Sequence, residues 1–181
     1  LEMAIMELFQ NEGYIYQNGE EIHKEISDVV LRDDLRSYLS DRYAEQNITP
    51  LETERAIARL TANVGQSVYE NNVATYRLIT KGFSLKRDVE TRCNHDVETW
   101  RAASLRTDLF IEPINFENPR ANILKIVNQL EIKGSEKRIP DGIVYINGLP
   151  MVVLEFKSAI KENTTIRDAY TQLTVRYRRD I

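Results

Sequence analysis

Apolar positions in the first half of the chain recur at helical spacing. Residues 1–13 carry apolar side chains at i, i+4, i+7 and i+8 counted from Leu1, and the run ends on Gly13. This pattern predicts a helix at the start of the chain. A second helix is expected over about residues 28–43.

The stretch TPLETERAIARL predicts a third helix from its opening residues. Thr49 is a good N-cap, Pro50 suits the first helical position, and Glu52 completes a capping box. The apolar residues that follow it keep the helical period. We therefore expect a helix that begins at this threonine.

The period changes in the second half of the chain. Short runs rich in β-branched residues alternate with Pro, Gly and Asn, which is typical of strands. A last helix is expected from residue 164 or 165 to about 178. The four runs are TDLFIEPINF, NILKIVNQLEI, GIVYING and MVVLEFKS.

We therefore predict an α/β (α+β) fold with a sheet flanked by helices. Its 181 residues suit a single domain, 1–181, and we expect it to be a fragment of a longer chain. The helical N-terminal part would cover about residues 1–105. The sheet and the following helix would cover about residues 106–181.

Composition and charge narrow the function classes. The chain has one cysteine, which excludes an internal disulfide framework and fits a reducing compartment. No apolar run approaches the ~20 residues that span a membrane. The net charge of −4 argues against a protein that is basic all over, yet residues 157–181 hold six Lys or Arg and three acids. Such a local basic surface fits a nucleic-acid groove or a solvated helix face equally well.

Candidate chemistry lies where charged residues interrupt the most apolar region. Residues 151–154 have the composition of a strand buried on both faces, yet Glu155 and Lys157 follow at once. Asp141 begins the preceding strand-like run, directly after a proline. Two acids and a lysine in this setting predict either a functional site or an exposed ion pair beside a turn residue.

The register of the predicted hairpin decides between these interpretations. Asn147-Gly148 is a strong hairpin signal. A loop of these two residues alone would put Asp141 and Glu155 on opposite faces. A three-residue loop that includes Leu149, or a bulge in a strand, would place the acids opposite each other with Cβ atoms ~4.5–5.5 Å apart.

If the two acids lie opposite each other, they and Lys157 are consistent with a metal-dependent reaction. Strand alternation puts Lys157 on the face of Glu155 and turns Phe156 to the other face. Paired carboxylates repel unless a proton or a cation joins them, and hard oxygen ligands suit Mg²⁺ or Mn²⁺. A lysine beside such a metal would orient or deprotonate an attacking water or stabilise transition-state charge. Two carboxylates, a metal ion and a lysine are suited to the attack of water on a phosphodiester.

The same residues resemble a known signature. Pro140, Asp141, Glu155 and Lys157 match the PD-(D/E)xK nuclease pattern. PDGIVYINGLPMVVLEFK followed by DAYTQLTVRYRRDI resembles the amino-terminal nuclease domain of the restriction (R) subunit of type I restriction–modification enzymes. LEMAIMELFQNEGYIY and NILKIVNQLEIKG also resemble that family, so the likeness covers nearly the whole chain.

The resemblance implies a restriction-endonuclease-like fold, with a mixed central sheet flanked by helices. It implies Asp141 and Glu155 as metal ligands, the Phe156 carbonyl as a third ligand, and Lys157 as the catalytic lysine. Gln172 matches the glutamine of the family's following helix.

Three further residues are expected to support the site or bind DNA. The family carries a tyrosine four residues after its glutamine, whereas Arg176 occupies that position here and Tyr177 comes one later. Tyr177 also belongs to an apolar stripe with Ile166, Tyr170 and Leu173, which favours a core position. Glu2 falls where many nucleases of this superfamily keep an acid near the site, although a solvated glutamate is the favoured interpretation.

The resemblance also implies a function and partners. It implies a Mg²⁺-dependent (or Mn²⁺-dependent) DNA endonuclease domain in the cytoplasm. The expected partners are double-stranded DNA, the methyltransferase (M) and specificity (S) subunits, and motor domains of its own chain. ATP is expected only in those motor domains, since this chain has no Walker motif. The alternatives are a repair or resolvase-type nuclease of the same superfamily, or a silent module that binds DNA or partners.

Overall fold

The computed structural model describes residues 1–63, 65, 67–87, 108–156 and 166–177. The chain divides into two compact units. The first unit combines residues 1–35 with 118–181, and the second comprises residues 36–117.

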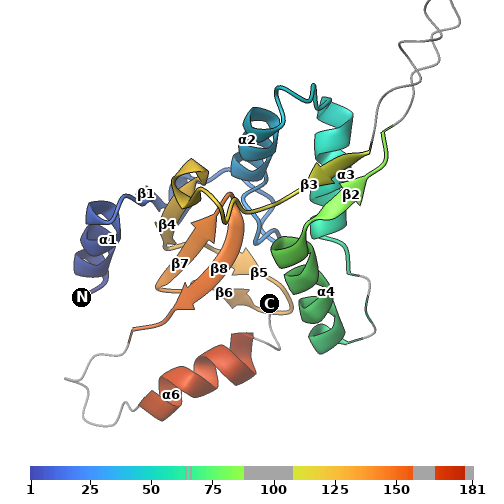
Figure 1. The fold of residues 1–181 in the computed structure, drawn as a ribbon. Coiled ribbons are helices and arrows are strands. Elements are labelled where there is room, and N and C mark those ends of the chain that lie inside the picture. Colours follow the sequence, from blue (N-terminus) through green and yellow to red (C-terminus); the bar gives the residue numbers. More distant parts are fainter. Residues whose placement is uncertain (64, 66, 88–107, 157–165, 178–181) are drawn as a thin grey trace, which may run out of the picture. The chain divides into compact units, whose positions relative to one another are not determined.

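A mixed four-stranded sheet forms the centre of the first unit (Figure 1). The strand order is β1-β4-β7-β8, with β1 parallel to β4 and the other neighbours antiparallel. The strands are β1 (Ile15–Asn18), β4 (Leu124–Asn128), β7 (Gly142–Ile146) and β8 (Leu149–Leu154). The predicted fold class is confirmed, since helices accompany this mixed sheet.

Both faces of the two central strands are buried. On one face, helix α1 (Glu2–Asn11) contributes Met6 to a cluster with Ile126 and Val144. On the other face, Val127 and Ile143 pack with residues from the chain that precedes α2. Side chains of alternate strand residues therefore meet apolar neighbours on either side, which explains the nearly continuous apolar runs of these strands.

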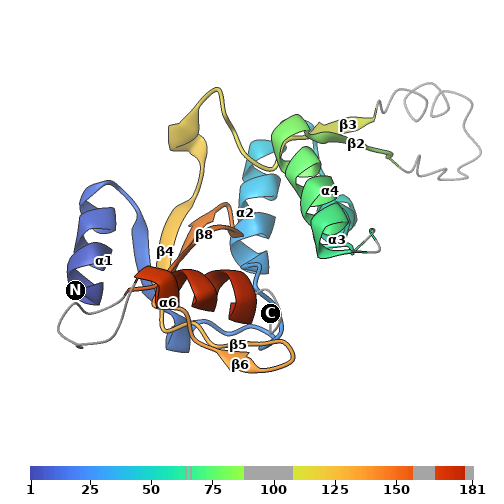
Figure 2. The same cartoon turned by 90° about the horizontal axis from the view of Figure 1, so that it is seen from below.

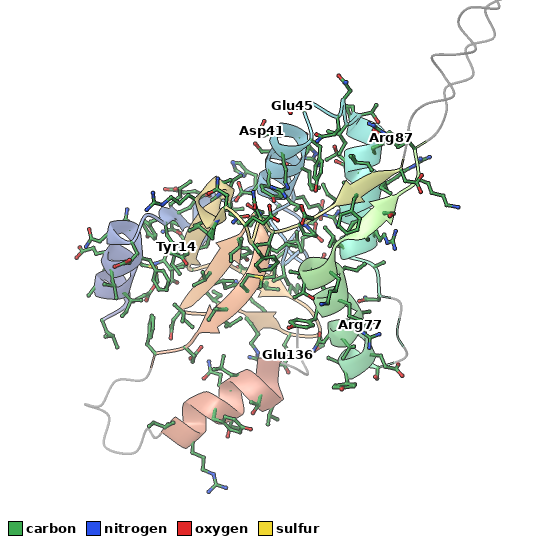
Figure 3. All side chains as sticks on the ribbon, in the orientation of Figure 1. Tyr14, Asp41, Glu45, Arg77, Arg87 and Glu136 are labelled. Carbon is green, nitrogen blue, oxygen red and sulfur yellow. The ribbon has the colours of Figure 1, made fainter. Side chains whose placement is uncertain are left out.

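Helix α1 is held beside the sheet by aromatic contacts as well. The rings of Phe9 and Tyr14 meet edge to face, with centroids 5.0 Å apart (Figure 3). Figure 2 shows α1 and β4 as neighbours when the sheet is viewed from below. Glu2 at the first turn of this helix is thereby brought to the end of β4.

Strand β8 departs from the prediction. It lies at the edge of the described sheet, and Met151, Val152 and Val153 are 40–48% exposed. The expectation of a strand buried on both faces is wrong for these residues, because β8 has a described neighbour on one side only. Apolar composition alone does not distinguish a central strand from an edge strand.

The turn between β7 and β8 has two residues with positive φ. Asn147 has φ 52° and Gly148 has φ 78°, as expected for the Asn-Gly hairpin. Asn147 is fully buried, and its Oδ1 accepts a hydrogen bond of 2.7 Å from the N–H of Ile123. The Gly148 carbonyl accepts a hydrogen bond of 2.9 Å from the N–H of Leu31. The turn is thus fixed to two other segments of the first unit.

The second unit is mainly helical. The Thr49–Glu52 capping box predicted from the sequence is present at the start of α3, with both reciprocal hydrogen bonds formed. A second box joins Ser67 and Glu70 at the start of α4, which the sequence interpretation missed. The second unit contains α3 (Pro50–Leu60), α4 (Val68–Lys81), the antiparallel pair β2 (Phe83–Leu85) and β3 (Leu109–Ile111), and the larger part of α2 (Arg32–Arg42).

A buried ion pair holds the second unit together. The guanidinium of Arg87 donates two hydrogen bonds to the carboxylate of Glu52, at 2.8 and 3.1 Å, and the two side chains are 8% and 5% exposed (Figure 3). The same guanidinium donates to the carbonyls of Gln46 and Asn47. The Arg87 hydrogen bonds lower the pKa of Glu52 to about 2.

The remaining described elements are short. Helix α6 (Ile166–Thr171) continues directly into a π-helix, η3 (Gln172–Tyr177). In the part of the chain that the structure describes, no helix has the length and apolar character needed to cross a membrane. The others are η1 (Gly19–Glu21), η2 (Pro119–Ala121), and the strand pair β5 (Ile132–Lys133) and β6 (Lys137–Arg138).

Candidate active site

One extra residue in β8 sets the register of the β7–β8 hairpin. Ile146 pairs with Leu149, so of the two loops expected from the sequence the two-residue loop, Asn147-Gly148, is present. Further along, Tyr145 pairs with Pro150, but Val144 pairs with Val152. Met151 is therefore a bulge residue that has no partner in the β7–β8 register.

The bulge brings the two acids to the same face. After it, Gly142 pairs with Leu154, so Asp141 and Glu155 are the next residues on the two strands. Opposite residues of an antiparallel pair point to the same side of the sheet. The geometric condition set by the sequence, an odd loop or a bulge, is met by the bulge.

A hydrogen bond shows that the strands stay together beyond their last ladder pair. Oδ2 of Asp141 accepts a hydrogen bond of 2.5 Å from the backbone N–H of Phe156. Both acids are half-buried, so neither carboxylate is removed from solvent or from a substrate. The Phe156 ring packs on the opposite face, against the cluster that contains Met6, as strand alternation predicts.

The remaining members of the predicted site are only partly described. Lys157 lies outside the described residues. Gln172 is half-buried in the π-helix, and the backbones of Arg176 and Tyr177 complete that helix.

The apolar stripe proposed for the last helix is not buried. Ile166 is 89% exposed and Tyr170 is 66% exposed. The prediction of a buried stripe is therefore wrong for these two residues, because both side chains face solvent. The stripe therefore no longer supports a core position for Tyr177.

Glu2 is held by hydrogen bonds, and among the described residues it belongs to no cluster of three acids. Its Oε1 accepts hydrogen bonds from Nδ2 of Asn128, at 2.8 Å, and from Nε2 of Gln129, at 2.9 Å. Oδ1 of the buried Asn128 accepts a third bond, 3.1 Å long, from the hydroxyl of Tyr16. The favoured interpretation of a solvated side chain is therefore wrong, since two amides hold the carboxylate.

This polar network lies at the same end of the sheet as the acids. Val127 of β4 pairs with Ile143 of β7, so the chain just after Val127 lies beside the chain just before Ile143. Asn128 and Asp141 therefore belong to the same end of these strands. Sequence interpretation missed Asn128, although an asparagine within the apolar run LKIVNQLEI is the signal of a buried, hydrogen-bonded polar residue.

The arrangement provides two carboxylates on one face for a cation. Among the described residues, no three His, Cys, Asp or Glu side chains come close enough together to hold a metal ion. A metal at this point would be shared between two acids, a backbone carbonyl, water and substrate oxygens. Mg²⁺ commonly uses one or two carboxylates and keeps several waters, so the residues present suit it.

The family model "Type I restriction enzyme R protein N terminus" matches residues 1–181.

The chain belongs to this family.

Individual members of the type I restriction enzyme family are similar over almost the whole chain. A putative MjaIXP endonuclease subunit of Methanocaldococcus jannaschii is 29% identical over 94% of this chain. The HindI endonuclease subunit of Haemophilus influenzae is 26% identical over 95%, and the SsaAORF53P endonuclease subunit of Staphylococcus saprophyticus is 26% identical over 99%. In each case the chain spans 16% of the relative's length. No solved structure matches.

Membership of the type I restriction R-protein family confirms the resemblance seen in the sequence. The identities and roles of the site residues stay predictions, since a family match assigns no residue. The bulge, the shared face of the acids and the hydrogen bond to Phe156 are the structural observations on which a functional proposal can rest.

Proposed function

We propose that this chain is the metal-dependent endonuclease region of a type I restriction R subunit. It would hydrolyse DNA phosphodiester bonds with little sequence preference, after translocation by ATP-driven motor domains elsewhere in the full-length protein. The observation that carries the proposal is the placement of Asp141 and Glu155 on one face by the bulge at Met151.

Each residue would have a distinct role in this reaction. Asp141, Glu155 and the Phe156 carbonyl would hold Mg²⁺ or Mn²⁺, which supplies Lewis-acid polarisation of the phosphate and a more acidic water. The N–H of Phe156 fixes the orientation of the Asp141 carboxylate. Lys157 would orient the water or neutralise charge on the pentavalent phosphorus transition state.

The proposed surroundings follow from the family. DNA contact would be mainly to phosphates and would weaken steeply with salt. The partners would be the methyltransferase and specificity subunits, which would supply target recognition in the cytoplasm. The printed names of the relatives, endonuclease subunits of type I enzymes, support this proposal.

Plasmid cleavage by the full complex tests the proposal. The full-length protein, assembled with its partner subunits, would be given ATP, Mg²⁺ and a plasmid that carries the recognition sequence. We expect Asp141→Asn, Glu155→Gln and Lys157→Ala each to abolish cleavage while ATP hydrolysis continues. Wild-type cleavage by these variants would show that the site is elsewhere. Unchanged DNA binding together with no cleavage by the wild-type complex would favour a silent binding module.

A further inference from the structure

Helix α4 is the longest helix that the structure describes, yet it has no buried residue. Tyr69 and Tyr76 are 71% and 67% exposed. Seven residues make almost two turns of an α-helix, so these two side chains lie on the same side of α4. Leu78 and Ile79, on the other side, are half-buried. The side that carries the two tyrosines is therefore left uncovered by the described residues of its unit.

The exposed side chains on this side of α4 are hydrogen-bond donors. After the first turn, every exposed residue of the helix carries an amide, a phenol, a guanidinium or an ammonium group, each of which has an N–H or O–H to donate. Tyr69 adds a second phenol one turn before Asn72. We call this set the donor face, and it consists of Tyr69, Asn72, Tyr76, Arg77 and Lys81.

The two cations of the donor face are not neutralised. Arg77 and Lys81 form no ion pair and no side-chain hydrogen bond within the described residues, whereas Arg36 of the same unit pairs with a glutamate. Helix α4 contains a single acid, Glu70 in its first turn, and the carboxylate of Glu70 accepts a hydrogen bond of 3.1 Å from the N–H of Ser67. The rest of the helix therefore presents positive charge only.

The phosphates of a nucleic acid match this set of side chains. A phosphodiester oxygen is an anionic acceptor that donates nothing, so it can accept from every member of the donor face. Tyr69 and Lys81 are twelve residues apart, or ~18 Å along the helix axis. Successive phosphates of one DNA strand are about 3.4 Å apart along the duplex axis, so the donor face is long enough for about five of them.

We propose that the donor face of α4 binds the phosphate backbone of duplex DNA without regard to sequence. This contact belongs to the second unit, whereas the candidate active site belongs to the first, so the donor face holds DNA without taking part in the cleavage chemistry. The tyrosines and the asparagine donate to phosphate oxygens, and the two cations release counterions. The inference rests on the proposed nuclease function, because that function makes DNA the substrate.

The salt dependence of DNA binding tests the two charges. The full-length protein is given a duplex without the recognition sequence, in the absence of Mg²⁺ and ATP. Arg77→Ala combined with Lys81→Ala should reduce the slope of log K against log salt concentration by about 1.8, since each neutralised phosphate contributes about 0.9. Arg77→Lys combined with Lys81→Arg should keep the slope, because both charges remain.

Two exposed cations on other helices of the second unit provide the control for net charge. Arg36→Ala on α2 combined with Arg55→Ala on α3 removes the same charge and should leave the slope unchanged. Equal slopes for the wild-type protein and for the double alanine variant of Arg77 and Lys81 overturn the proposal. An equal reduction of the slope by the Arg36 and Arg55 control also overturns it.

The two phenols are tested without a change of charge. Tyr69→Phe combined with Tyr76→Phe should weaken binding roughly tenfold or more, because hydrogen bonds to charged phosphates are lost, and should keep the salt slope. A photo-reactive p-benzoyl-phenylalanine in place of Tyr76 should cross-link to the duplex. The same group in place of Leu51, which is 60% exposed on α3, should not. No cross-link from position 76, or equal cross-linking from both positions, overturns the proposal.

Binding in the absence of Mg²⁺ separates this inference from the proposed function. If Asp141→Asn cleaves plasmid at the wild-type rate in the full complex, the proposed nuclease site is wrong, and the salt slopes still decide the donor face. If Asp141→Asn is inactive but loss of Arg77 and Lys81 leaves the slope unchanged, only the donor face is wrong. Normal DNA binding together with failed assembly of that double variant would make the face a protein interface and overturn the proposal.

Discussion

The carboxylate of Asp141 accepts a hydrogen bond of 2.5 Å from the backbone N–H of Phe156. These residues come from the two strands that carry the candidate site, one position beyond the paired residues Gly142 and Leu154. The bond fixes the side chain of one acid relative to the backbone that carries Glu155. It is possible only in the register that the bulge at Met151 creates.

Insertion of one alanine after Val153 is expected to abolish cleavage. The inserted residue would pair with Gly142, so Asp141 then faces Leu154 while Glu155 points to the other side. Met151→Ala keeps the residue count and should keep most of the activity, since this side chain is 41% exposed. Plasmid cleavage and thermal unfolding of both variants check the prediction.

Deletion of Met151 provides the matched control for this insertion. It removes the unpaired residue, so Val144 still faces Val152 and Asp141 still faces Glu155. We expect the deletion variant to cleave DNA. An insertion variant that is folded and fully active would show that the register does not control the site.

Gly148→Ala is expected to destabilise the protein by roughly 1–3 kcal/mol, from backbone strain combined with overlap. Its φ is 78°, and an added Cβ would lie 2.2 Å from the carbonyl oxygen of Leu31. Gly13 has φ 91° but has nothing within 4 Å of such a Cβ. Gly13→Ala should therefore cost less. Equal losses of stability in thermal unfolding would mean that the contact with Leu31 has no effect.

The buried pair of Glu52 and Arg87 predicts a pH dependence of stability. Since the pKa of Glu52 is held at about 2, against 4.5 in the unfolded chain, its contribution is complete above pH 4.5 and is lost as pH falls towards 2. The shift corresponds to about 3 kcal/mol. Glu52→Gln should therefore lower the free energy of unfolding strongly at pH 7 and much less at pH 3.

Glu54→Gln is the matched control on the same helix. Glu54 pairs with Arg36, but the two side chains are 49% and 44% exposed, so the loss should stay below about 1 kcal/mol. Chemical unfolding at several pH values compares the two variants. A pH-independent effect of Glu52→Gln would contradict the assignment of its low pKa to Arg87.

Glu2→Gln is expected to destabilise the attachment of helix α1 to the end of β4, without changing the Mg²⁺ concentration that cleavage requires. The variant replaces a charged acceptor of two amide hydrogen bonds, a change that costs roughly 1–3 kcal/mol. The Mg²⁺ concentration for half-maximal cleavage should stay the same, since no described group of three acids includes Glu2. Glu7→Gln, an exposed position on the same helix, is the control. A large rise in the Mg²⁺ requirement would make Glu2 a ligand.

Elements with strong local signals were predictable from the sequence. The capping box at Thr49 fixed the start of α3, and Asn147-Gly148 fixed the hairpin turn. Strand β1 and helix α4 are among the elements that were missed, for different reasons. Strand β1 has only four residues and depends on a parallel partner far along the chain, so its own sequence gives little signal. Helix α4 does carry a Ser-x-x-Glu capping signal at Ser67, and that signal was overlooked.

The register of the site was not predictable in the same way. The residues near a turn determine its length, but a bulge depends on how two strands pack against the rest of the sheet. Met151 carries no glycine-like signal that would mark it. The sequence therefore indicated which residues had to meet, and only the structure showed how they meet.

The bulge also restricts how the lengths of related sequences can vary. Between Asp141 and Glu155, paired positions have to be gained or lost on both strands together, whereas the unpaired Met151 can be lost alone. Homologues that cut DNA by the same arrangement should therefore keep this spacing outside the loop, or lack one residue together with the bulge. A natural homologue with a single residue added to one strand and no second bulge would be expected to have lost cleavage, even with both acids and the lysine in place.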